Sequence, residues 1–272
     1  MATEEFNFKP FTRHQFYHSL TDRFLDMVNL GPDQRIVDLA CGSGSVTSQI
    51  VQRLRDARDT VIIAIDHSAT ALRDAMDDLC DARDSAVEFV QSRVEQLSET
   101  LREPVDTVVY CNAIHYVEDK DALIKEVAKV VKPGGTFAFN TSFYDGGNPP
   151  ETQQFYRKWM LRAARNLRRD HGLSPVRAER VESRKHLTPE EYCALLERNG
   201  FKVVSQKTDR VLVPIEGWQD ISRFEDFIKG VMPGVPLDKA SDAMVKGVQG
   251  VFEELNVKYI PRNWLDVVSV KT

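Results

Sequence analysis

Two carboxylates and a pair of glycines follow apolar runs in the first half of the chain. Asp38 lies near the end of the run at residues 35–40, and Cys41-Gly42-Ser43-Gly44 follows it. Glycines between a strand and a helix let the backbone approach a ligand where a Cβ would clash. Asp66 ends the next run, at residues 60–65. The pattern predicts a crevice that binds a ligand carrying positive charge.

Glycine pairs after a strand also occur in nucleotide-binding proteins. The dinucleotide fingerprint requires Gly or Ala at its third position, where this chain has Thr47. That fold also places a pyrophosphate at the helix start, and the charge of Asp38 would oppose it. A P-loop requires Gly-Lys-Ser/Thr, which does not follow here. The P-loop is therefore excluded, and an NAD-type oxidoreductase stays open as a disfavoured alternative.

The elements that must position these residues alternate between strands and helices. Nearly all-apolar runs suit strands buried on both faces of a parallel sheet. Ser68 is a predicted N-cap, and Thr188 with Glu191 forms a predicted capping box. The predicted strands are residues 35–40, 60–65, 87–90, 105–110, 136–140, 202–214 and 264–270, and the predicted helices are about 46–54, 68–79, 120–131 and 188–199. This alternation predicts a doubly wound α/β fold with ligands at the carboxyl ends of its strands.

Length and composition limit the protein class. The chain has 272 residues, 28% of them charged, and a net charge of -5, which disfavours a general nucleic-acid binder. Its four cysteines form no Cys-x-x-Cys pair, which argues against disulfides or zinc and for a reducing compartment. The longest apolar run, residues 61–65, is too short to span a bilayer, and the acidic N-terminus is no secretory signal. We therefore expect a cytoplasmic globular protein without stable membrane insertion.

Four segments resemble the motifs of the class I S-adenosylmethionine-dependent methyltransferases, small-molecule type, in the family's order and spacing. They are Val37–Gly44, Ala64–Ser68 with Leu72, Asp106–Val117 and Val131–Gly135. The resemblance covers residues 30–143. It implies a Rossmann-like, seven-stranded, mainly parallel sheet whose last strand is antiparallel, with added helical lid segments.

We expect one methyltransferase domain, residues 1–272, in which the two segments outside the resemblance are additions packed over the crevice. Residues 1–30 would be a helix that covers the cofactor, and 31–143 the cofactor-binding core. Residues 144–187 and 215–259 would be lid and substrate segments, and 188–214 and 260–272 would complete the sheet.

The resemblance implies S-adenosyl-L-methionine as cofactor and a set of residues around it. Asp38 suits the ammonium group, Asp66 the ribose hydroxyls, and Tyr17 the methionyl carboxylate. The implied cofactor-binding residues are Tyr17, Asp38, Ala40, Gly42, Gly44, Asp66, His67, Arg93, Val94, Asn112 and Ala113. Arg93 departs from the family, which often has an acidic acceptor for adenine there, since arginine accepts no hydrogen bond. The Val94 backbone, stacking on Arg93, or Glu95 after a register shift are the alternatives.

The acceptor side is less defined by the sequence. His115 follows the fourth strand and is either a general base or a packed polar residue. Cys41 and Cys111 have no base partner in the pattern, so they are predicted to line the crevice and not to act as nucleophiles. The candidate substrate-binding residues are His14, Tyr116, Asn140, Tyr144, Arg162, Arg165 and Arg169. His14 and His18 have the spacing of a metal pair, but no third ligand is evident, so no metal is expected.

Residues 157–185 contain ten basic and three acidic side chains, a strong contrast with the acidic chain. One interpretation is a solvated helix face, and another is a face for membranes or nucleic acid. In a third, inward arginines bind an anionic acceptor such as a carboxylate, a phosphate or a carrier-bound thioester. The nearby aromatics Trp159, Trp218, Phe224 and Phe227 would form core or wall a substrate pocket.

The implied activity is methyl transfer from S-adenosylmethionine to a small molecule of the metabolite or natural-product class, an anionic one under the third interpretation. A non-catalytic S-adenosylmethionine-binding protein is a second alternative beside the oxidoreductase. The expected partner is the small-molecule substrate, with no nucleic acid, and with a carrier protein left open.

Overall fold

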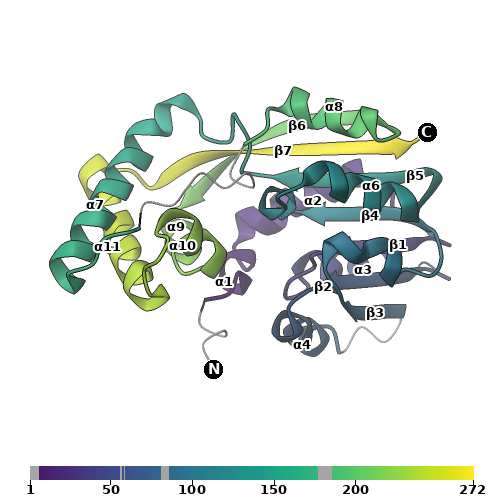
Figure 1. Cartoon of the computed structure of the whole chain (residues 1–272), viewed down its shortest axis with the longest axis horizontal. Coiled ribbons are helices and arrows are strands. Elements are labelled where there is room, and N and C mark those ends of the chain that lie inside the picture. Colours follow the sequence, from purple (N-terminus) through teal and green to yellow (C-terminus); the bar gives the residue numbers. More distant parts are fainter. Residues whose placement is uncertain (1–5, 56, 58, 81–85, 177–185) are drawn as a thin grey trace. The chain divides into compact units, whose positions relative to one another are not determined.

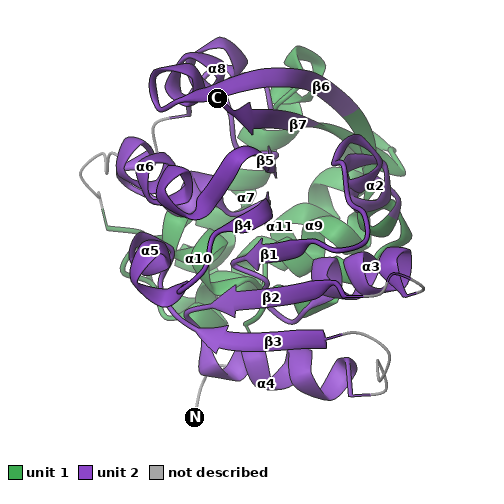
Figure 2. Cartoon of the chain, turned by 90° about the vertical axis from the view of Figure 1, so that its right-hand side faces the viewer, with its two compact units in different colours: residues 1–18, 148–181, 210–263 green, residues 19–147, 182–209, 264–272 purple. Residues whose placement is uncertain are grey.

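The computed structural model describes residues 6–55, 57, 59–80, 86–176 and 186–272. The chain divides into two compact units, shown in different colours in Figure 2. We call residues 19–147, 182–209 and 264–272 the sheet unit, and residues 1–18, 148–181 and 210–263 the helical unit. The helical unit contains most of the segments that the sequence analysis set apart from the sheet. A lid role for them stays a prediction.

The sheet has seven strands in the order β3-β2-β1-β4-β5-β7-β6 (Figure 1). β7 runs antiparallel to β5, and the other pairs from β3 to β5 are parallel. This confirms the predicted fold class. The strands are β1 (Arg35–Leu39), β2 (Val61–Asp66), β3 (Ala86–Gln91), β4 (Val105–Cys111), β5 (Val131–Thr141), β6 (Phe201–Pro214) and β7 (Tyr259–Lys271).

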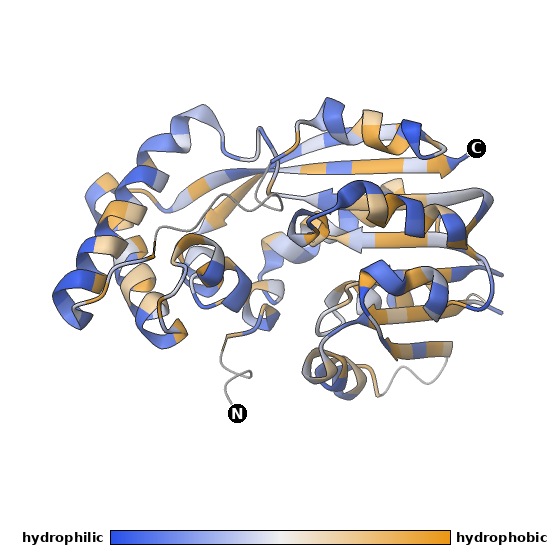
Figure 3. Cartoon of the chain, in the orientation of Figure 1, coloured by the Kyte–Doolittle hydropathy of each residue, from blue (hydrophilic) through white to orange (hydrophobic). Residues whose placement is uncertain are grey.

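Helices cover both faces of this sheet. Buried side chains of α2 (Gln15–Met27) and α3 (Ser45–Leu54) pack on one face with Ile36, Val109 and Ala138. Those of α5 (Leu97–Thr100), α6 (Lys120–Val130) and α8 (Pro189–Arg198) pack on the other face. Figure 3 shows the hydrophobic residues that run along the central strands. This double burial explains why the strands appear in the sequence as apolar runs.

Local signals placed several helix starts correctly. Ser68 accepts a hydrogen bond from the Ala71 amide at the start of α4 (Ala69–Asp78). Thr188 and Glu191 form the predicted capping box at the start of α8. The fifth strand, by contrast, is longer than predicted and begins at Val131, so Pro133-Gly134-Gly135 lies inside β5. Val105 of β4 pairs with Val131, and a register shift accommodates the intervening residues. The short helices η1 (Val94–Gln96) and η2 (Ile114–Tyr116) follow β3 and β4.

The helical unit is built around paired helices. It comprises α1 (Lys9–Thr12), η3 (Pro150–Thr152), α7 (Gln153–His171), α9 (Ile215–Ile221), α10 (Glu225–Val231) and α11 (Leu237–Leu255). Trp159 is buried, stacks on Phe227 and donates a hydrogen bond to the Met244 carbonyl. Trp218 packs edge-on against Trp159. These aromatics form the core of the helical unit, which favours the core interpretation of their spacing.

Candidate functional site

The turn between β1 and α3 has the backbone geometry of a ligand-binding loop. Ala40, Gly42 and Gly44 all have positive φ angles, of 54°, 56° and 82°. A Cβ on Gly42 would enter open space, with no described atom within 4 Å. A Cβ on Gly44 would lie 2.9 Å from the Ala75 Cβ on α4. Gly44 is therefore required for packing between the loop and α4, whereas Gly42 leaves room beside the backbone for a ligand.

Asp66 ties the carboxyl end of β2 to this loop. Its Oδ2 accepts a hydrogen bond from the Gly42 amide at 2.8 Å, and its Oδ1 accepts one from the Ser68 amide at 2.8 Å. The His67 side chain is mostly exposed, with its Nδ1 3.4 Å from Asp66 Oδ1. A carboxylate has about four acceptor positions, so two amide donors leave capacity for further hydroxyl donors.

Asp38 is completely enclosed on the face of the sheet that carries α3. Its Oδ2 accepts a hydrogen bond of 2.6 Å from the Thr47 hydroxyl. The pKa of Asp38 is raised to about 7, mainly by burial and also by the nearby charge of Asp66, while the hydrogen bonds from Thr47 lower it. A cation placed here would favour the ionised form of Asp38. Thr47, which occupies the position where the dinucleotide fingerprint requires Gly or Ala, therefore donates a hydrogen bond to this carboxyl group.

The carboxyl ends of β4 and β5 are joined through two asparagines. The Asn112 amide donates to the Asn140 backbone oxygen and to its Oδ1, both at 2.9 Å. Asn112 itself has a φ angle of 49°, a left-handed conformation that Asn tolerates well. Its Oδ1 accepts from the amide and hydroxyl of Ser142. Asn112 and Asn140 are thus brought together, and Ala113, the N-cap of η2, follows Asn112.

His115 lies in η2 with its ring held on several sides. Its Nδ1 is 3.0 Å from the Thr141 hydroxyl, and its ring centroid is 4.1 Å from that of Tyr116 and 4.4 Å from that of Phe143. His115 is buried, whereas Tyr116 is 39% exposed. Tyr144 is buried in the core beneath α6 and α8, which gives its predicted acceptor role no support.

Arg93 lies after β3 as predicted, exposed and at the N-cap of η1. Val94 follows it and packs partly against the core. Arg93 therefore stands where the family often has an acidic acceptor for adenine, and it cannot accept a hydrogen bond. The three alternatives for holding adenine therefore stay open.

Tyr17 and His14, two predicted site residues, contact side chains of the helical unit. Tyr17 is buried, with its ring 5.5 Å from that of Phe11 and 5.8 Å from that of Phe8. His14 Nε2 lies 2.8 Å from Asp220 Oδ2, and the His14 ring stacks on Phe16. The roles of Tyr17 and His14 toward cofactor and acceptor stay predictions.

The arginines of α7 predicted to bind the acceptor have other partners or face outward. Arg162 and Lys158 both pair with Glu254 on α11. Arg169 pairs with Asp170, and Arg165 is exposed. Buried positions on α7 are Phe155, Trp159, Ala163 and Leu167. The geometry therefore matches the solvated-face interpretation and gives no support to inward arginines. The other basic residues of the segment, Arg177, Arg180, Arg184 and Lys185, lie outside the described residues.

Both crevice cysteines are poor nucleophiles. Burial is the largest effect on Cys41 and on Cys111, and it raises the pKa of both thiols. The neighbouring carboxyl of Asp38 raises both pKa values further. A thiol is reactive as the thiolate, so these cysteines stay inert, as the sequence interpretation expected.

The sequence analysis missed Asp266 on β7. It pairs in register with Asn140, which in turn pairs with Cys111. Asp266 is 1% exposed, and neither of its carboxyl oxygens has a hydrogen-bond partner among the described residues. Its pKa is raised to about 7, mainly by burial and also by Asp209, while the charges of Lys207 and Arg23 oppose the shift. A single acidic residue within the apolar run Trp264–Val268 was the signal that could have identified it.

A doubly wound sheet of this strand order, with an acidic glycine turn at β1 and a carboxylate at the end of β2, defines a class I S-adenosylmethionine-dependent methyltransferase fold. Comparisons with known proteins agree with this assignment. Residues 37–137 match the family model described as a methyltransferase domain. Over that segment the chain is similar to methyltransferase domains, and S-adenosylmethionine is the cofactor that this similarity supports.

Individual relatives are distant. A Saccharomyces cerevisiae protein named as a probable S-adenosylmethionine-dependent methyltransferase is 30% identical over 110 residues, 40% of this chain and 36% of that protein. The Legionella pneumophila ubiquinone/menaquinone biosynthesis C-methyltransferase is 27% identical over 195 residues, 68% of this chain and 74% of the relative. The cyclopropane synthase MmaA2 of Mycobacterium tuberculosis superposes with a TM-score of 0.58 at 14% identity, covering 94% of this chain and 84% of the synthase. The chain spans about a quarter to just over half of the first curated relatives it matches.

Among the described residues, no helix is long and apolar enough to cross a membrane.

Proposed function

We propose that the chain transfers the methyl group of S-adenosylmethionine to a small-molecule acceptor. The observation that carries this proposal is the open space beside Gly42, whose amide is bonded to the Asp66 carboxylate. The residues fit the cofactor: a carboxylate suits ribose hydroxyls, and the buried Asp38 suits an ammonium group. A dinucleotide would instead bring its diphosphate toward two carboxyl groups, which costs free energy.

When bound, the cofactor supplies an electrophilic methyl group on a positively charged sulfur. The chain's own work is to align and enclose the reacting atoms. The Gly42–Gly44 backbone would lie under the cofactor and Asp66 would accept hydrogen bonds from its ribose, while the linked Asn112 and Asn140 hold the ends of β4 and β5 in place. Because Asn112 is anchored by two hydrogen bonds, the wall at this end of the sheet is preorganised.

His115 enters the mechanism only for an acceptor that is protonated at working pH. Its Nδ1 contact with the Thr141 hydroxyl orients the imidazole, and a neutral imidazole can take up an acceptor proton. An acceptor that is already a free amine or an anion needs no base. His115 is therefore proposed as a base for hydroxyl acceptors.

The acceptor itself is proposed only as a small metabolite or natural product. Curated relatives include proteins named as a phosphoethanolamine N-methyltransferase, a ubiquinone biosynthesis O-methyltransferase and a ubiquinone/menaquinone biosynthesis C-methyltransferase. Their common element is methyl transfer, and they favour no single acceptor atom. Acceptor binding by segments 144–187 and 215–259 stays a prediction from the sequence, since the described aromatics Trp159 and Trp218 pack in a core.

Thermal-shift and calorimetric titrations test the cofactor assignment. S-adenosylhomocysteine should raise the melting temperature of the protein and NAD should not, since a ligand that binds only the folded state stabilises it. Asp66→Asn should weaken S-adenosylhomocysteine binding by about 10- to 100-fold, the worth of hydrogen bonds to a charged acceptor. Asp77→Asn on α4, an exposed position, is the matched control.

Stabilisation by NAD alone, or unchanged affinity in Asp66→Asn, would contradict the proposal. Release of S-adenosylhomocysteine during incubation with candidate acceptors then separates an enzyme from a protein that only binds the cofactor.

A further inference from the structure

One side of α7 carries three arginines that pair with no carboxylate of the described residues. Gln154, Arg157, Leu161, Ala164, Arg165 and Arg168 are all exposed, and we call them the arginine face. Their spacing of three, four and seven residues places them on one side of the helix. The buried residues Trp159, Ala163 and Leu167 occupy the opposite side. The arginine face therefore takes no part in the core of the unit.

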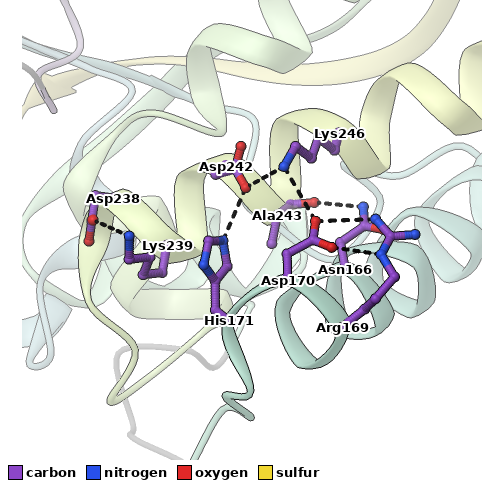
Figure 4. A network of polar contacts seen from close by, with 9 residues as sticks. All are labelled: Asn166, Arg169, Asp170, His171, Asp238, Lys239, Asp242, Ala243 and Lys246. Carbon is purple, nitrogen blue, oxygen red and sulfur yellow. Dashed lines mark hydrogen bonds and ion pairs between the residues drawn. The ribbon is translucent and has the colours of Figure 1, made fainter.

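Other basic residues of the same helix are paired. Lys158 and Arg162 contact Glu254, and Arg169 contacts Asp170. Figure 4 shows how Asp170 also receives Lys246 of α11, next to the His171–Asp242 contact. Among the described residues, no carboxylate pairs with Arg157, Arg165 or Arg168. The pairing stops at the border of the arginine face.

This selective pairing stands out against the composition of the chain. The net charge is -5, and Asp and Glu number 41, yet the arginine face contains no acidic residue. Near its centre Leu161 is 48% exposed, with Arg157 and Arg165 each four residues away. Three guanidinium groups around one exposed apolar side chain make a surface that is complementary to an anionic layer with apolar material beneath it.

We infer that the arginine face docks reversibly on an anionic lipid surface. Guanidinium groups bind phosphate oxygens in bidentate fashion, which suits phosphodiester headgroups. Leu161 is placed to reach the apolar boundary below the headgroups. A protein partner is less favoured, because interface centres are enriched in aromatic anchors and this face has none. This inference is independent of the proposed methyl transfer.

The expected strength is modest and depends on salt. Each arginine beside an anionic bilayer is worth about fivefold in partitioning, so three give about 100-fold. Salt screens the contact because the side chains are exposed.

Vesicle sedimentation of the full chain tests the inference. Phosphatidylcholine vesicles with about one third phosphatidylglycerol are compared with phosphatidylcholine alone, at low and high salt. The triple variant Arg157→Gln, Arg165→Gln, Arg168→Gln is compared with Arg73→Gln, Arg102→Gln, Lys202→Gln, which changes net charge equally at exposed positions of the sheet unit. If the glutamine variant folds poorly, a variant with lysine in place of the three α7 arginines is used instead, because lysine keeps the positive charge.

We expect the wild type to bind anionic vesicles at low salt and to dissociate at high salt. The arginine-face glutamine variant should lose about 100-fold in partitioning, and the control triple should lose far less. Leu161→Gln should weaken binding by a smaller factor. If both triple variants lost equal amounts of vesicle binding, the binding would depend only on net charge, and this result would overturn the inference. Absence of binding to anionic vesicles, with capture on immobilised polyglutamate instead, would overturn it in favour of an acidic protein partner.

Discussion

The loops after β1 and β2 and the outer side of α7 both concentrate charged side chains, but they treat them in opposite ways. At the loops, Asp38 and Asp66 are buried and receive hydrogen bonds from Thr47, Gly42 and Ser68. On α7, Lys158 and Arg162 pair with Glu254 of α11 and Arg169 pairs with Asp170, whereas Arg157, Arg165 and Arg168 are exposed and pair with no described carboxylate. A buried charge needs fixed donors, whereas a solvated one needs none. The loops are therefore built for one ligand, and α7 is built for a surface.

The largest expected effect is at Gly44. In Gly44→Val, a branched side chain would meet Ala75 and would need a φ angle of 82°. Overpacking and backbone strain together should cost about 3 kcal/mol or more in unfolding free energy. Denaturant unfolding measures this loss.

Gly42→Ala sharpens the comparison between the two glycines. Its Cβ would enter open space, so the substitution causes no clash. The left-handed backbone conformation alone should lower the unfolding free energy by about 1 kcal/mol. Binding of S-adenosylhomocysteine should nevertheless fall steeply, because the Cβ occupies the space assigned to the ligand. If Gly42→Ala bound S-adenosylhomocysteine as tightly as the wild type, the loop would not approach the ligand.

The buried carboxyl group of Asp266 should make the stability of the protein depend on pH. Its folded-state pKa of about 7 lies above the ordinary 3.8, so the folded state favours the neutral acid. Its contribution to stability is full below about pH 4 and is lost as the pH rises toward 7. Asp266→Asn should therefore be more stable than the wild type at pH 8 and should show little difference at pH 4.

Asp121 should show the opposite sign. Hydrogen bonds from Lys125, Asn199 and Arg198 lower its pKa, so Asp121→Asn should lose stability at neutral pH and not in acid. Denaturant unfolding of Asp266→Asn from about pH 4 to 8, and of Asp121→Asn from about pH 7 down to about pH 2, measures the two profiles. Parallel profiles for Asp266→Asn and the wild type would show that Asp266 does not titrate in this range.

The smallest effect is expected at Glu254, on the surface of the helical unit. The hydrogen bonds from Lys158 and Arg162 lower its pKa to about 2, but all three groups are solvated. Glu254→Gln should change the unfolding free energy far less than Asp266→Asn does, because exposed ion pairs contribute little. High salt should remove even that difference, which thermal unfolding at two ionic strengths would measure. A loss as large as that of Gly44→Val would mean that this pair is part of the core.

The regular fold could be predicted from the sequence because its signals are local. Apolar runs mark the central strands, and Ser68 and Thr188 mark helix starts that the structure confirms. The start of β5 could not be predicted, because its pairing with Val105 overrides the turn preference of Pro133-Gly134-Gly135. Tertiary pairing of this kind leaves no signature within the segment itself.

The site divides in the same way. Glycine conformations and the position of Asp66 follow from the motif, since they depend on neighbouring backbone. The partners of α7 do not, because Glu254 lies 92 residues after Arg162 and no local pattern connects the two. Asp266 was missed because its significance depends on Asn140 and Cys111, which lie on other strands.

The contact at Gly44 also restricts how this protein can diverge. Ala75 is fully buried, and the position of a Gly44 Cβ lies only 2.9 Å from the Ala75 Cβ, so the loop and α4 meet across two residues of minimal size. Neither position can accept a larger residue while the other stays as it is. Among descendants of this sequence, the two sites should change together or not at all, and a homologue with a bulkier residue at position 75 would have to move its fourth helix away from the cofactor loop.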